Sequence, residues 1–407
     1  MPTRYSAGRA VRADPPLAHA PLAHDKPAHA QPAHAQLGDT QAGGGRLEAP
    51  PPADAPVHGG RLQAARMMFP AAPEPFIDLS TGINPHSYPL EPFSAAALTR
   101  LPEPEAEAAL LALAAHAYGA GPTMPTGSAP PQPPGQAADP ALAGVVAAPG
   151  SQILISLLPS VLGCRRAVLL SPTYSEHAAS WHASGAGIRH VHDPDALLAE
   201  AGAGIALVLC NPNNPDGRRV PHDLLARLAR RCGETGGMLV VDEAFADLEP
   251  GHMPAASLLP CEGLVVLRSF GKTHGLAGLR LGFMLSNPVT ARRMRTLLGP
   301  WAVSGPAIEA GLQALGDPAW RTRTGAILAI STCRLDGMLV AAGLTVPGGT
   351  RLFRLADAPD ARRIFEQLGR AGILVRRFDH QPGWLRFGLP GDEAAWLRLQ
   401  QALAALA

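Results

Sequence analysis

A lysine in a glycine-rich run is the side chain whose setting is most unusual for its type. The run from Arg268 to Arg280 reads Arg-Ser-Phe-Gly-Lys-Thr-His-Gly-Leu-Ala-Gly-Leu-Arg and follows an apolar stretch. An amine that reacts with an aldehyde needs a lowered pKa, which apolar or cationic neighbours supply. The small residues around Lys272 would let a flat ring approach the backbone. Lys272 is therefore a candidate anchor for an aldehyde cofactor; the alternative is an ordinary lysine in a surface turn.

Two places offer hydrogen-bond donors to a phosphate group. Ser269 could donate a hydrogen bond from its hydroxyl, and the guanidinium of Arg280 could donate two parallel hydrogen bonds. Pro149-Gly150-Ser151-Gln152 precedes an apolar helical run, so free backbone N–H groups stand at a predicted helix start. A plain N-cap by Ser151 would look the same.

Three further polar or aromatic side chains follow predicted strands. Asp242 ends an apolar strand and could pair with a protonated ring nitrogen, although such an Asp is otherwise a helix cap or a metal ligand. Asn214 lies in the loop Asn-Pro-Asn-Asn-Pro-Asp-Gly, whose prolines constrain its path, and could donate to a ring oxygen. Tyr174, in Pro-Thr-Tyr, could stack on a flat ring, or it could be a core tyrosine.

The composition excludes several functional classes. A formal net charge of +1 on 407 residues provides no overall field for nucleic acid or an anionic membrane. The five cysteines are scattered without a Cys-x-x-Cys pair, so we expect neither disulfides nor a zinc site. No apolar stretch approaches the roughly 20 residues of a membrane span, and the N-terminal residues lack the apolar h-region of a secretory signal, so we expect an unexported protein. We therefore predict a soluble, cytoplasmic small-molecule enzyme without metal, nucleic-acid or membrane partners.

Two segments have the composition of low-complexity chain. Residues 1–56 are rich in Ala, Pro, His and Gly, and residues 121–140 in Pro, Gly, Ser and Gln. We interpret the first as a disordered tail and the second as a surface insertion. The histidines of the Ala-His pairs in the tail could capture a metal, but a solvated tract is the simpler interpretation.

Elsewhere, short β-rich runs alternate with helical patterns. We predict buried strands at 167–170, 205–210, 238–241, 264–268 and 281–285. Such alternation predicts a mostly parallel sheet with helices on both faces, and ligands of such sheets bind at the carboxyl ends of the strands. A second, α+β unit is predicted from about Ser304, with strands at 351–355, 374–377 and 384–387 and a helix at 361–371.

Five segments, taken in order, resemble the signatures of the fold-type I enzymes that use pyridoxal 5′-phosphate (PLP). They are Gly-Ser-Gln, Pro-Thr-Tyr, Asn-Pro-Asn-Asn-Pro, Asp-Glu-Ala-Phe, and Ser-Phe-Gly-Lys followed by Arg280. The resemblance implies an α/β fold with a mostly parallel sheet sandwiched by helices, beside a smaller α+β domain. It extends from about His58 to the C-terminus. The expected segments are 1–56 (tail), 57–89 (joining the small domain), 90–303 (large PLP-binding domain) and 304–407 (small domain).

The resemblance also assigns roles residue by residue. The cofactor-binding residues it implies are Gly150, Ser151, Gln152, Tyr174, Asn214, Asp242, Ser269, Lys272 and Arg280. Lys272 would be the catalytic residue that forms the Schiff base, Asp242 would hold the pyridine nitrogen, Asn214 would bind the ring oxygen and Tyr174 would stack on the ring. Arg386 would bind the substrate α-carboxylate.

A subgroup is indicated by His58-Gly59-Gly60-Arg61-Leu62 and by Asp-Leu-Ser-Thr-Gly-Ile-Asn-Pro at 78–85. Both resemble the threonine-phosphate decarboxylases of cobalamin biosynthesis, although the glycines could simply form a flexible hinge. The substrate-binding residues that the resemblance implies are His58, Gly59, Gly82, Asn84, Arg351 and Arg386.

Two residues depart from the family pattern. Phe245 replaces a frequent tyrosine, which removes one hydrogen bond to the ring oxygen and suits the decarboxylases better than the related histidinol-phosphate aminotransferases. Asp216 replaces a threonine at a position not expected to touch the cofactor.

The expected activity is PLP-dependent decarboxylation of L-threonine O-3-phosphate to (R)-1-aminopropan-2-ol O-2-phosphate. The alternative is a histidinol-phosphate aminotransferase or a related class I/II aminotransferase. The bond perpendicular to the ring is the one that breaks, so substrate anchoring decides between the two. Lys272, a tyrosine or water could reprotonate Cα.

Two non-enzymatic classes are disfavoured. A regulator of transcription would need a helix-turn-helix that the tail does not show, and an inactive module would not need Lys272, Asp242 and Arg280. By analogy with this fold we expect a homodimer.

Overall fold

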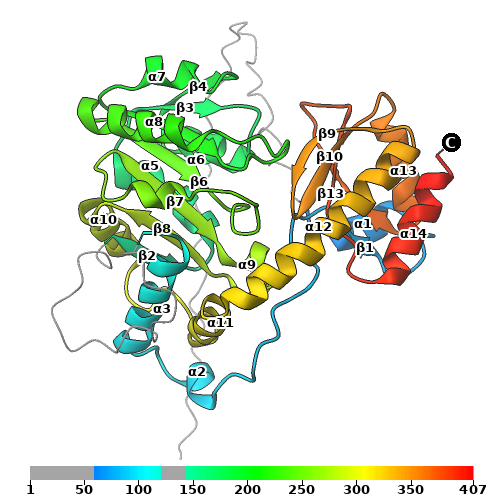
Figure 1. The fold of residues 1–407 in the computed structure, drawn as a ribbon, viewed down its shortest axis with the longest axis horizontal. Coiled ribbons are helices and arrows are strands. Elements are labelled where there is room, and N and C mark those ends of the chain that lie inside the picture. The colour runs from blue at the N-terminus through cyan, green and yellow to red at the C-terminus, as the bar shows by residue number, and fades with distance from the viewer. Residues whose placement is uncertain (1–58, 121–143, 407) are drawn as a thin grey trace, which may run out of the picture. The chain divides into compact units, whose positions relative to one another are not determined.

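A computed structural model describes residues 59–120 and 144–406 (Figure 1). The predicted tail, the predicted insertion and His58 lie outside the described residues. Residues Asp54–Ala407 form one compact unit. The domain boundaries near 89 and 303 therefore stay predictions.

A seven-stranded sheet contains the five strands predicted for the large unit, in the order β2-β8-β7-β6-β5-β3-β4. Its strands are β2 (Val145–Ala148), β3 (Arg166–Leu170), β4 (Gly187–Val191), β5 (Ile205–Cys210), β6 (Met238–Asp242), β7 (Leu264–Ser269) and β8 (Gly282–Ser286). Strands β7 to β4 are parallel, and only β8 pairs antiparallel, with β7 and β2. The mostly parallel sheet is confirmed. Strand β4 escaped prediction because most of its side chains are exposed or half-buried, so it has no apolar run.

Helices cover both faces of this sheet (Figure 1). They include α3 (Pro104–Ala117), α5 (Ser151–Leu162), α6 (Ser175–Ala183), α7 (Ala196–Glu200), α8 (His222–Thr235), α10 (Pro288–Leu298) and α11 (Gly305–Leu315). Successive strand residues point to opposite faces. Val168 and Leu170 accordingly pack in one buried apolar cluster, and Ala167 and Leu169 in another. The sheet is therefore buried on both sides, as its near-continuous apolar strands predict.

The C-terminal part contains an antiparallel sheet in the order β12-β13-β10-β9. Its strands are β9 (Thr345–Thr350), β10 (Phe353–Asp357), β12 (Arg376–Arg377) and β13 (Trp384–Phe387). Its helices are α12 (Pro318–Ala341), α13 (Ala361–Arg370) and α14 (Glu393–Ala404). A short strand from the N-terminal segment, β1 (Ile77–Asp78), pairs in parallel with β11 (Ile373–Leu374).

Two sequence predictions in this part need correction. The strand predicted at 351–355 begins at Phe353, because Arg351 and Leu352 form the turn between β9 and β10. The strand predicted at 374–377 is divided between β11 and β12, which pair with different strands. Apolar patterns mark buried runs but not the residues at which a strand changes partner.

Helix α12 is long and apolar enough to cross a membrane by length and composition, with a hydropathy of 1.3. The sequence-based expectation that no segment is long and apolar enough to span a membrane is therefore wrong for the described residues. Core helices of soluble proteins pass it too. Leu328, Leu335 and Leu339 of α12 are fully buried in the apolar cluster of the C-terminal part, and α12 contacts β9 and β10. One face of α12 therefore packs on this apolar cluster, while Ile330 and Val340 are exposed.

Candidate active site

Three parallel strands bring the predicted chemical groups to one edge of the large sheet. Strands β5, β6 and β7 are neighbours, with Cys210 opposite Asp242 and Asp242 opposite Leu267. Asn214 follows β5, Asp242 ends β6, and Lys272 lies in the single-turn helix α9 (Phe270–Thr273) directly after β7. Because carboxyl ends of parallel strands meet at one edge, residues far apart in sequence converge there.

Lys272 has the surroundings of a reactive amine. Its Nζ lies 4.8 Å from the centre of the Phe245 ring. Burial is the largest effect and lowers the pKa of Lys272; Asp242 opposes this, whereas the nearby cations Arg386 and Arg280 lower the pKa further. A lysine of this kind yields the neutral amine more readily than an exposed one does.

Asp242 is held by a histidine that the sequence did not single out. His177 Nε2 lies 3.0 Å from Asp242 Oδ2, and both side chains are buried. The backbone N–H of Ala244 donates to the other carboxylate oxygen at 3.0 Å. Burial is the largest single effect and disfavours the charged imidazole, but the hydrogen bonds and charges of Asp242 and Cys210 together outweigh it and raise the pKa of His177 to about 10. The same hydrogen bond lowers the pKa of Asp242 against the effect of its burial. A charged pair therefore stands at the end of β6.

Cys210 lies beside this pair, and one ligand atom from each of His177, Cys210 and Asp242 falls within 4.8 Å of the others. His177 Nε2 and Asp242 Oδ2, one possible metal ligand from each side chain, are already engaged with each other. We therefore interpret the group as an ion pair next to a thiol. No sequence pattern marks His177, which lies one helical turn after Tyr174 in α6.

The predicted phosphate-binding residues converge at the start of α5. Gly150 has φ +82°, and a Cβ added there would lie 2.5 Å from Arg280 Nη2. A Cβ on Gly282 would lie 2.4 Å from the backbone nitrogen of Ser151. Only glycine thus lets the Arg280 guanidinium and strand β8 approach the free N–H groups of the helix start. Ser269 Oγ is 3.5 Å from Lys272 Nζ, beside the same region. These donors together fit a dianionic phosphate.

Tyr174 and Gln152 are joined by a hydrogen bond. Tyr174 Oη donates to Gln152 Oε1 at 3.0 Å, and Gln152 Nε2 donates to Glu176 Oε2 at 3.0 Å. Burial raises the pKa of Tyr174, so the phenol stays protonated at neutral pH. Gln152 therefore orients Tyr174; the predicted stacking of Tyr174 on a ring stays a prediction.

Arg386 connects strand β13 with the Asn214 loop. Its Nη1 donates to Asn214 Oδ1 at 2.5 Å, and its Nη2 donates to the carbonyl of Ser80 at 2.9 Å. Its Nε is buried and has no hydrogen-bond partner among the described residues. Burial lowers the pKa of Arg386 to about 9, so the side chain remains cationic at pH 7.

A second arginine, which the sequence prediction missed, lies directly opposite Arg386. The antiparallel register of β12 and β13 pairs Arg376 with Arg386. Arg376 Nη1 is also buried without a hydrogen-bond partner within the described part of the chain. Like charges opposite each other in a sheet are unfavourable unless an anion lies between them. The register of two short strands creates this pair, and no motif in the sequence announces it.

The N-terminal segment reaches the same residues. Asn84 binds the Lys272 helix twice: its backbone N–H donates to the Lys272 carbonyl at 2.9 Å, and its Nδ2 donates to the Thr273 carbonyl at 2.8 Å. A Cβ on Gly82 would lie 2.8 Å from a ring carbon of Phe245. A Cβ on Gly59 would lie 2.5 Å from the carbonyl oxygen of Ser80, the atom that Arg386 binds. Gly59, Gly82 and Asn84 thus line the walls around Lys272 and Arg386.

Arg351 lies in a different setting. Its backbone N–H donates to Glu249 Oε1 at 2.6 Å. It lines a cavity of about 430 Å³ whose walls include Glu249, Asp336 and Arg354 but not Lys272 or Arg386. Its predicted role at the substrate stays a prediction.

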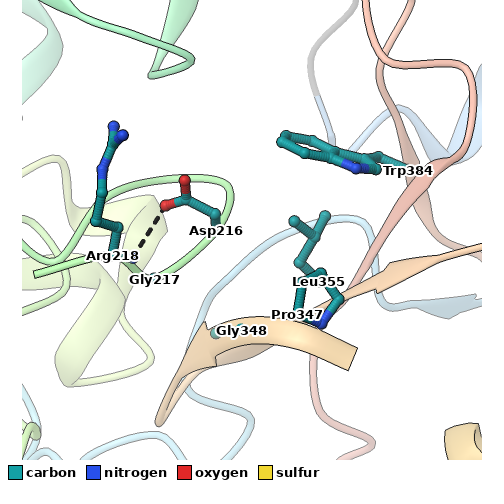
Figure 2. A pocket seen from close by; sticks show the side chains of 8 residues that line it. Asp216, Gly217, Arg218, Pro347, Gly348, Leu355 and Trp384 are labelled. Carbon is teal, nitrogen blue, oxygen red and sulfur yellow. Dashed lines mark hydrogen bonds between the residues drawn. The ribbon is translucent and has the colours of Figure 1, made fainter. Parts of the chain in front are cut away.

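A cavity of about 420 Å³ opens next to the Asn214 loop. Figure 2 shows Asp216 and Arg218 on one side of it and the Trp384 ring on the other. Asp216 Oδ1 accepts hydrogen bonds from the Arg218 backbone N–H at 2.9 Å and from Asn213 Nδ2 at 2.8 Å. Asp216, which departs from the family pattern, therefore stabilises the turn in which it lies.

Comparison with known proteins agrees with this arrangement. The family model for aminotransferase class I and II matches residues 136–403, more than half of the chain. A solved structure of histidinol-phosphate aminotransferase from Sinorhizobium meliloti in complex with pyridoxal-5′-phosphate superposes with a TM-score of 0.66 at 21% identity, covering 85% of this chain and 95% of that one. The chain belongs to the class I and II aminotransferase family and has its fold.

Two curated relatives narrow the grouping. The threonine-phosphate decarboxylase of Sinorhizobium sp is 40% identical over 350 residues, covering 86% of this chain and 97% of the relative. That of Pseudomonas aeruginosa is 38% identical over 351 residues, covering 85% and 96%. Relatives named histidinol-phosphate aminotransferase match over shorter parts of the chain. Within its family, the chain groups with the threonine-phosphate decarboxylases.

Proposed function

We propose that this protein is a PLP-dependent enzyme that decarboxylates L-threonine O-3-phosphate to (R)-1-aminopropan-2-ol O-2-phosphate. The observation that carries the proposal is the pair of opposed arginines, Arg376 and Arg386, each with a buried nitrogen that lacks a partner among the described residues. Two such cations require anionic groups between or beside them. Threonine phosphate supplies two, a carboxylate and a phosphate, and the relatives that match almost end to end carry this substrate in their names.

The residues around Lys272 fit the cofactor. Lys272 would hold it covalently, Asp242 would bind the ring nitrogen, and Asn214 the ring oxygen. Its phosphate would lie where Gly150 gives Arg280 access to the N-terminus of α5. Bound PLP supplies an electron sink for the pair of electrons released at the substrate Cα. The ionised His177–Asp242 pair suits this purpose, because a carboxylate stabilises a protonated ring nitrogen.

The protein's own residues would determine which bond breaks. Arg386, fixed by Asn214 and Ser80, and Arg376 would anchor the two anionic groups of the substrate. This anchoring would orient the substrate so that its carboxylate, and not the Cα hydrogen, is the group lost from Cα. Lys272 Nζ would then deliver a proton to Cα, since burial lowers its pKa and makes its ammonium form a better proton donor.

The second candidate is a histidinol-phosphate aminotransferase, which the shorter matches favour. Histidinol phosphate carries a phosphate but no carboxylate, so it offers one anionic group to the two arginines, whereas threonine phosphate offers two. The amino acid partner of a transaminase carries two carboxylates, however, so charge alone does not separate the two reactions.

We also propose the setting of the enzyme. The family's fold and the near-neutral charge suit a cytoplasmic homodimer that acts on a small molecule, without nucleic-acid or membrane partners, in cobalamin biosynthesis. The domain division at about 89 and 303 belongs to the same proposal.

The decisive experiment gives the purified, PLP-loaded protein threonine phosphate and measures CO₂ release and the phosphorylated amino alcohol. We expect stoichiometric CO₂ and product, and borohydride should trap cofactor on Lys272. Transfer of the amino group from glutamate without CO₂ would establish the aminotransferase instead. Protein that stays colourless with PLP, with no borohydride adduct at Lys272, would overturn both.

A further inference from the structure

A buried ionic network lies beside the Lys272 helix and is not explained by substrate or cofactor binding. It consists of Glu243, Asp247, Arg268 and Thr273 and is called the Asp247 network below. Arg268 Nη1 donates to Asp247 Oδ1 at 2.9 Å, and Arg268 Nη2 lies 3.3 Å from Glu243 Oε2. Thr273 Oγ1 donates to Asp247 Oδ2 at 2.8 Å. These side chains are almost entirely inaccessible to solvent.

Each of the other three members is a chain neighbour of a residue assigned to the site. Glu243 follows Asp242, Arg268 precedes Ser269, and Thr273 follows Lys272. The network therefore fixes the backbone at the ends of β6 and β7 and in α9. The side chains next to it belong to the candidate site: Asp242 binds His177, and Ser269 Oγ lies 3.5 Å from Lys272 Nζ.

Helix α9 cannot hold Lys272 in place by itself. It spans only Phe270–Thr273, and a single turn is unstable without tertiary contacts. Its fixed points are Asn84, which binds the carbonyls of Lys272 and Thr273, and Asp247, which binds the Thr273 hydroxyl. The carboxylate of Asp247 is also ion-paired with Arg268, and hydrogen bonds to carboxylates are stronger than those to neutral acceptors.

We propose that Asp247 and Thr273 are positioning residues for Lys272: the Asp247–Thr273 hydrogen bond sets the orientation of α9 and hence the place of the lysine amine. This inference rests on the proposed function only in that Lys272 carries the cofactor. A misplacement of about 1 Å in a reacting group costs on the order of 100-fold in rate. The hydroxyl should therefore matter more to turnover than to stability.

The test compares Thr273→Val, which removes the hydroxyl at nearly constant volume, with Thr273→Ser, which keeps it. The matched control is Thr332→Val, because Thr332 is equally buried but its hydroxyl binds only carbonyls of its own helix α12. Three properties are measured: kcat and KM with threonine phosphate, the pH midpoint of the absorbance of the lysine-bound cofactor, and the melting temperature of the apoprotein. The pH dependence of Lys272 acetylation by acetic anhydride, read by mass spectrometry of the apoprotein, needs neither cofactor nor substrate.

We expect Thr273→Val to lower kcat by about 10- to 100-fold, with KM changed by less than about 3-fold, as for a misplaced reacting group. Its absorbance midpoint and its acetylation profile should both shift from those of the wild type. Thr273→Ser should restore kcat to within about 3-fold, because it retains the hydroxyl donor. Thr332→Val should lower the melting temperature without moving either titration.

The proposal is overturned if Thr273→Val and Thr332→Val behave alike, or if Thr273→Ser fails to rescue. Should Thr273→Val not fold, Asp247→Asn is read by the same acetylation profile, and an unshifted Lys272 profile there refutes the positioning role. A failure of the proposed reaction looks different: wild-type protein would release no CO₂, while the acetylation profiles would still differ between Thr273→Val and Thr273→Ser.

Discussion

At the scale of single residues, the candidate site contains two arginines, Arg376 and Arg386, that each keep one buried nitrogen without a hydrogen-bond partner in the described part of the chain. Arg268 is buried and pairs with the carboxylates of Glu243 and Asp247. Arg386 and Arg376 differ, because neither forms an ion pair with a carboxylate of the described residues. Burial, and after it the charge of Arg376, lowers the pKa of Arg386. Burying a charge without an opposite charge costs free energy, so we interpret Arg376 and Arg386 as a binding site for anionic groups.

This difference predicts the effect of removing one cation. Arg376→Gln should raise the KM for threonine phosphate by about 10- to 100-fold, because a hydrogen bond to a charged group contributes about 1.5–3 kcal/mol. The neighbouring Arg377 is exposed and packs over Phe365, so Arg377→Gln is the matched control and should change KM by less than about 2-fold. Steady-state kinetics of the two variants provide the measurement, and equal KM values would remove Arg376 from the substrate site.

At the scale of elements, the loop that carries Asn214 is pressed against strand β9. A Cβ on Gly217 would lie 2.1 Å from the carbonyl oxygen of Gly349, and a Cβ on Gly348 would lie 2.1 Å from that of Asp216. The two backbones therefore touch without side chains between them. This contact joins the loop after β5 to the sheet that contributes Arg386, and Asn214 and Arg386 meet next to it.

Gly217→Ala should therefore disturb the site from a distance. Both Gly217 and the open Gly204 have positive φ, +74° and +68°, so alanine costs about 1 kcal/mol of backbone strain at either position. Only at Gly217 does a methyl group also collide with backbone, which should add about 1–3 kcal/mol and displace the Asn214 loop.

Urea denaturation and kcat/KM of Gly217→Ala and Gly204→Ala would measure the two effects. We expect both variants to be less stable and only Gly217→Ala to lose activity, by about 10-fold or more if the loop moves by a fraction of an ångström. Full activity in Gly217→Ala would show that the loop position does not depend on β9.

At the scale of the whole molecule, the buried His177–Asp242 pair links site chemistry to stability. The pKa of His177 is raised from 6.5 to about 10, so protonated His177 stabilises the fold fully below about pH 6.5, and this contribution is lost as the pH rises through about 10. The pKa of Asp242 is lowered from 3.8, so its contribution is present above that pH and is lost as the pH falls through the lowered value. The pair is most stabilising between these limits.

His177→Gln should consequently lose about 3–5 kcal/mol of unfolding free energy at pH 7, because it leaves Asp242 buried without its cation. The wild-type free energy should decline between pH 7 and pH 10, and that decline should be absent in the variant. His182→Gln, on the exposed face of the same helix α6, is the control and should stay within about 0.5 kcal/mol of the wild type. Urea denaturation of the apoprotein across this pH range tests the prediction; a parallel pH profile in His177→Gln would contradict it.

Much of this molecule was determined locally, by the sequence itself. The apolar runs defined the central strands β3, β5, β6, β7 and β8 to within one or two residues, because a doubly buried strand needs an unbroken apolar run. Lys272, Asp242 and Asn214 could be selected because each follows such a strand, and parallel strands end at one edge. The sequence did not show why glycine is needed at 150 and 282, because the segments that approach these residues, at Arg280 and Ser151, are brought there by the fold.

The tertiary structure alone decided which residues became partners. Arg376 faces Arg386 through the register of two short strands, His177 meets Asp242 from a separate helix, and Asp247 reaches Thr273 across 26 positions of sequence. Strand register and helix packing are set by the sum of many distant contacts, so no local pattern encodes them. The sequence by itself therefore indicated the class of chemistry and the lysine that we propose performs it, whereas the folded chain determined the contacts of that lysine and the pairing of the two arginines that we propose bind the substrate.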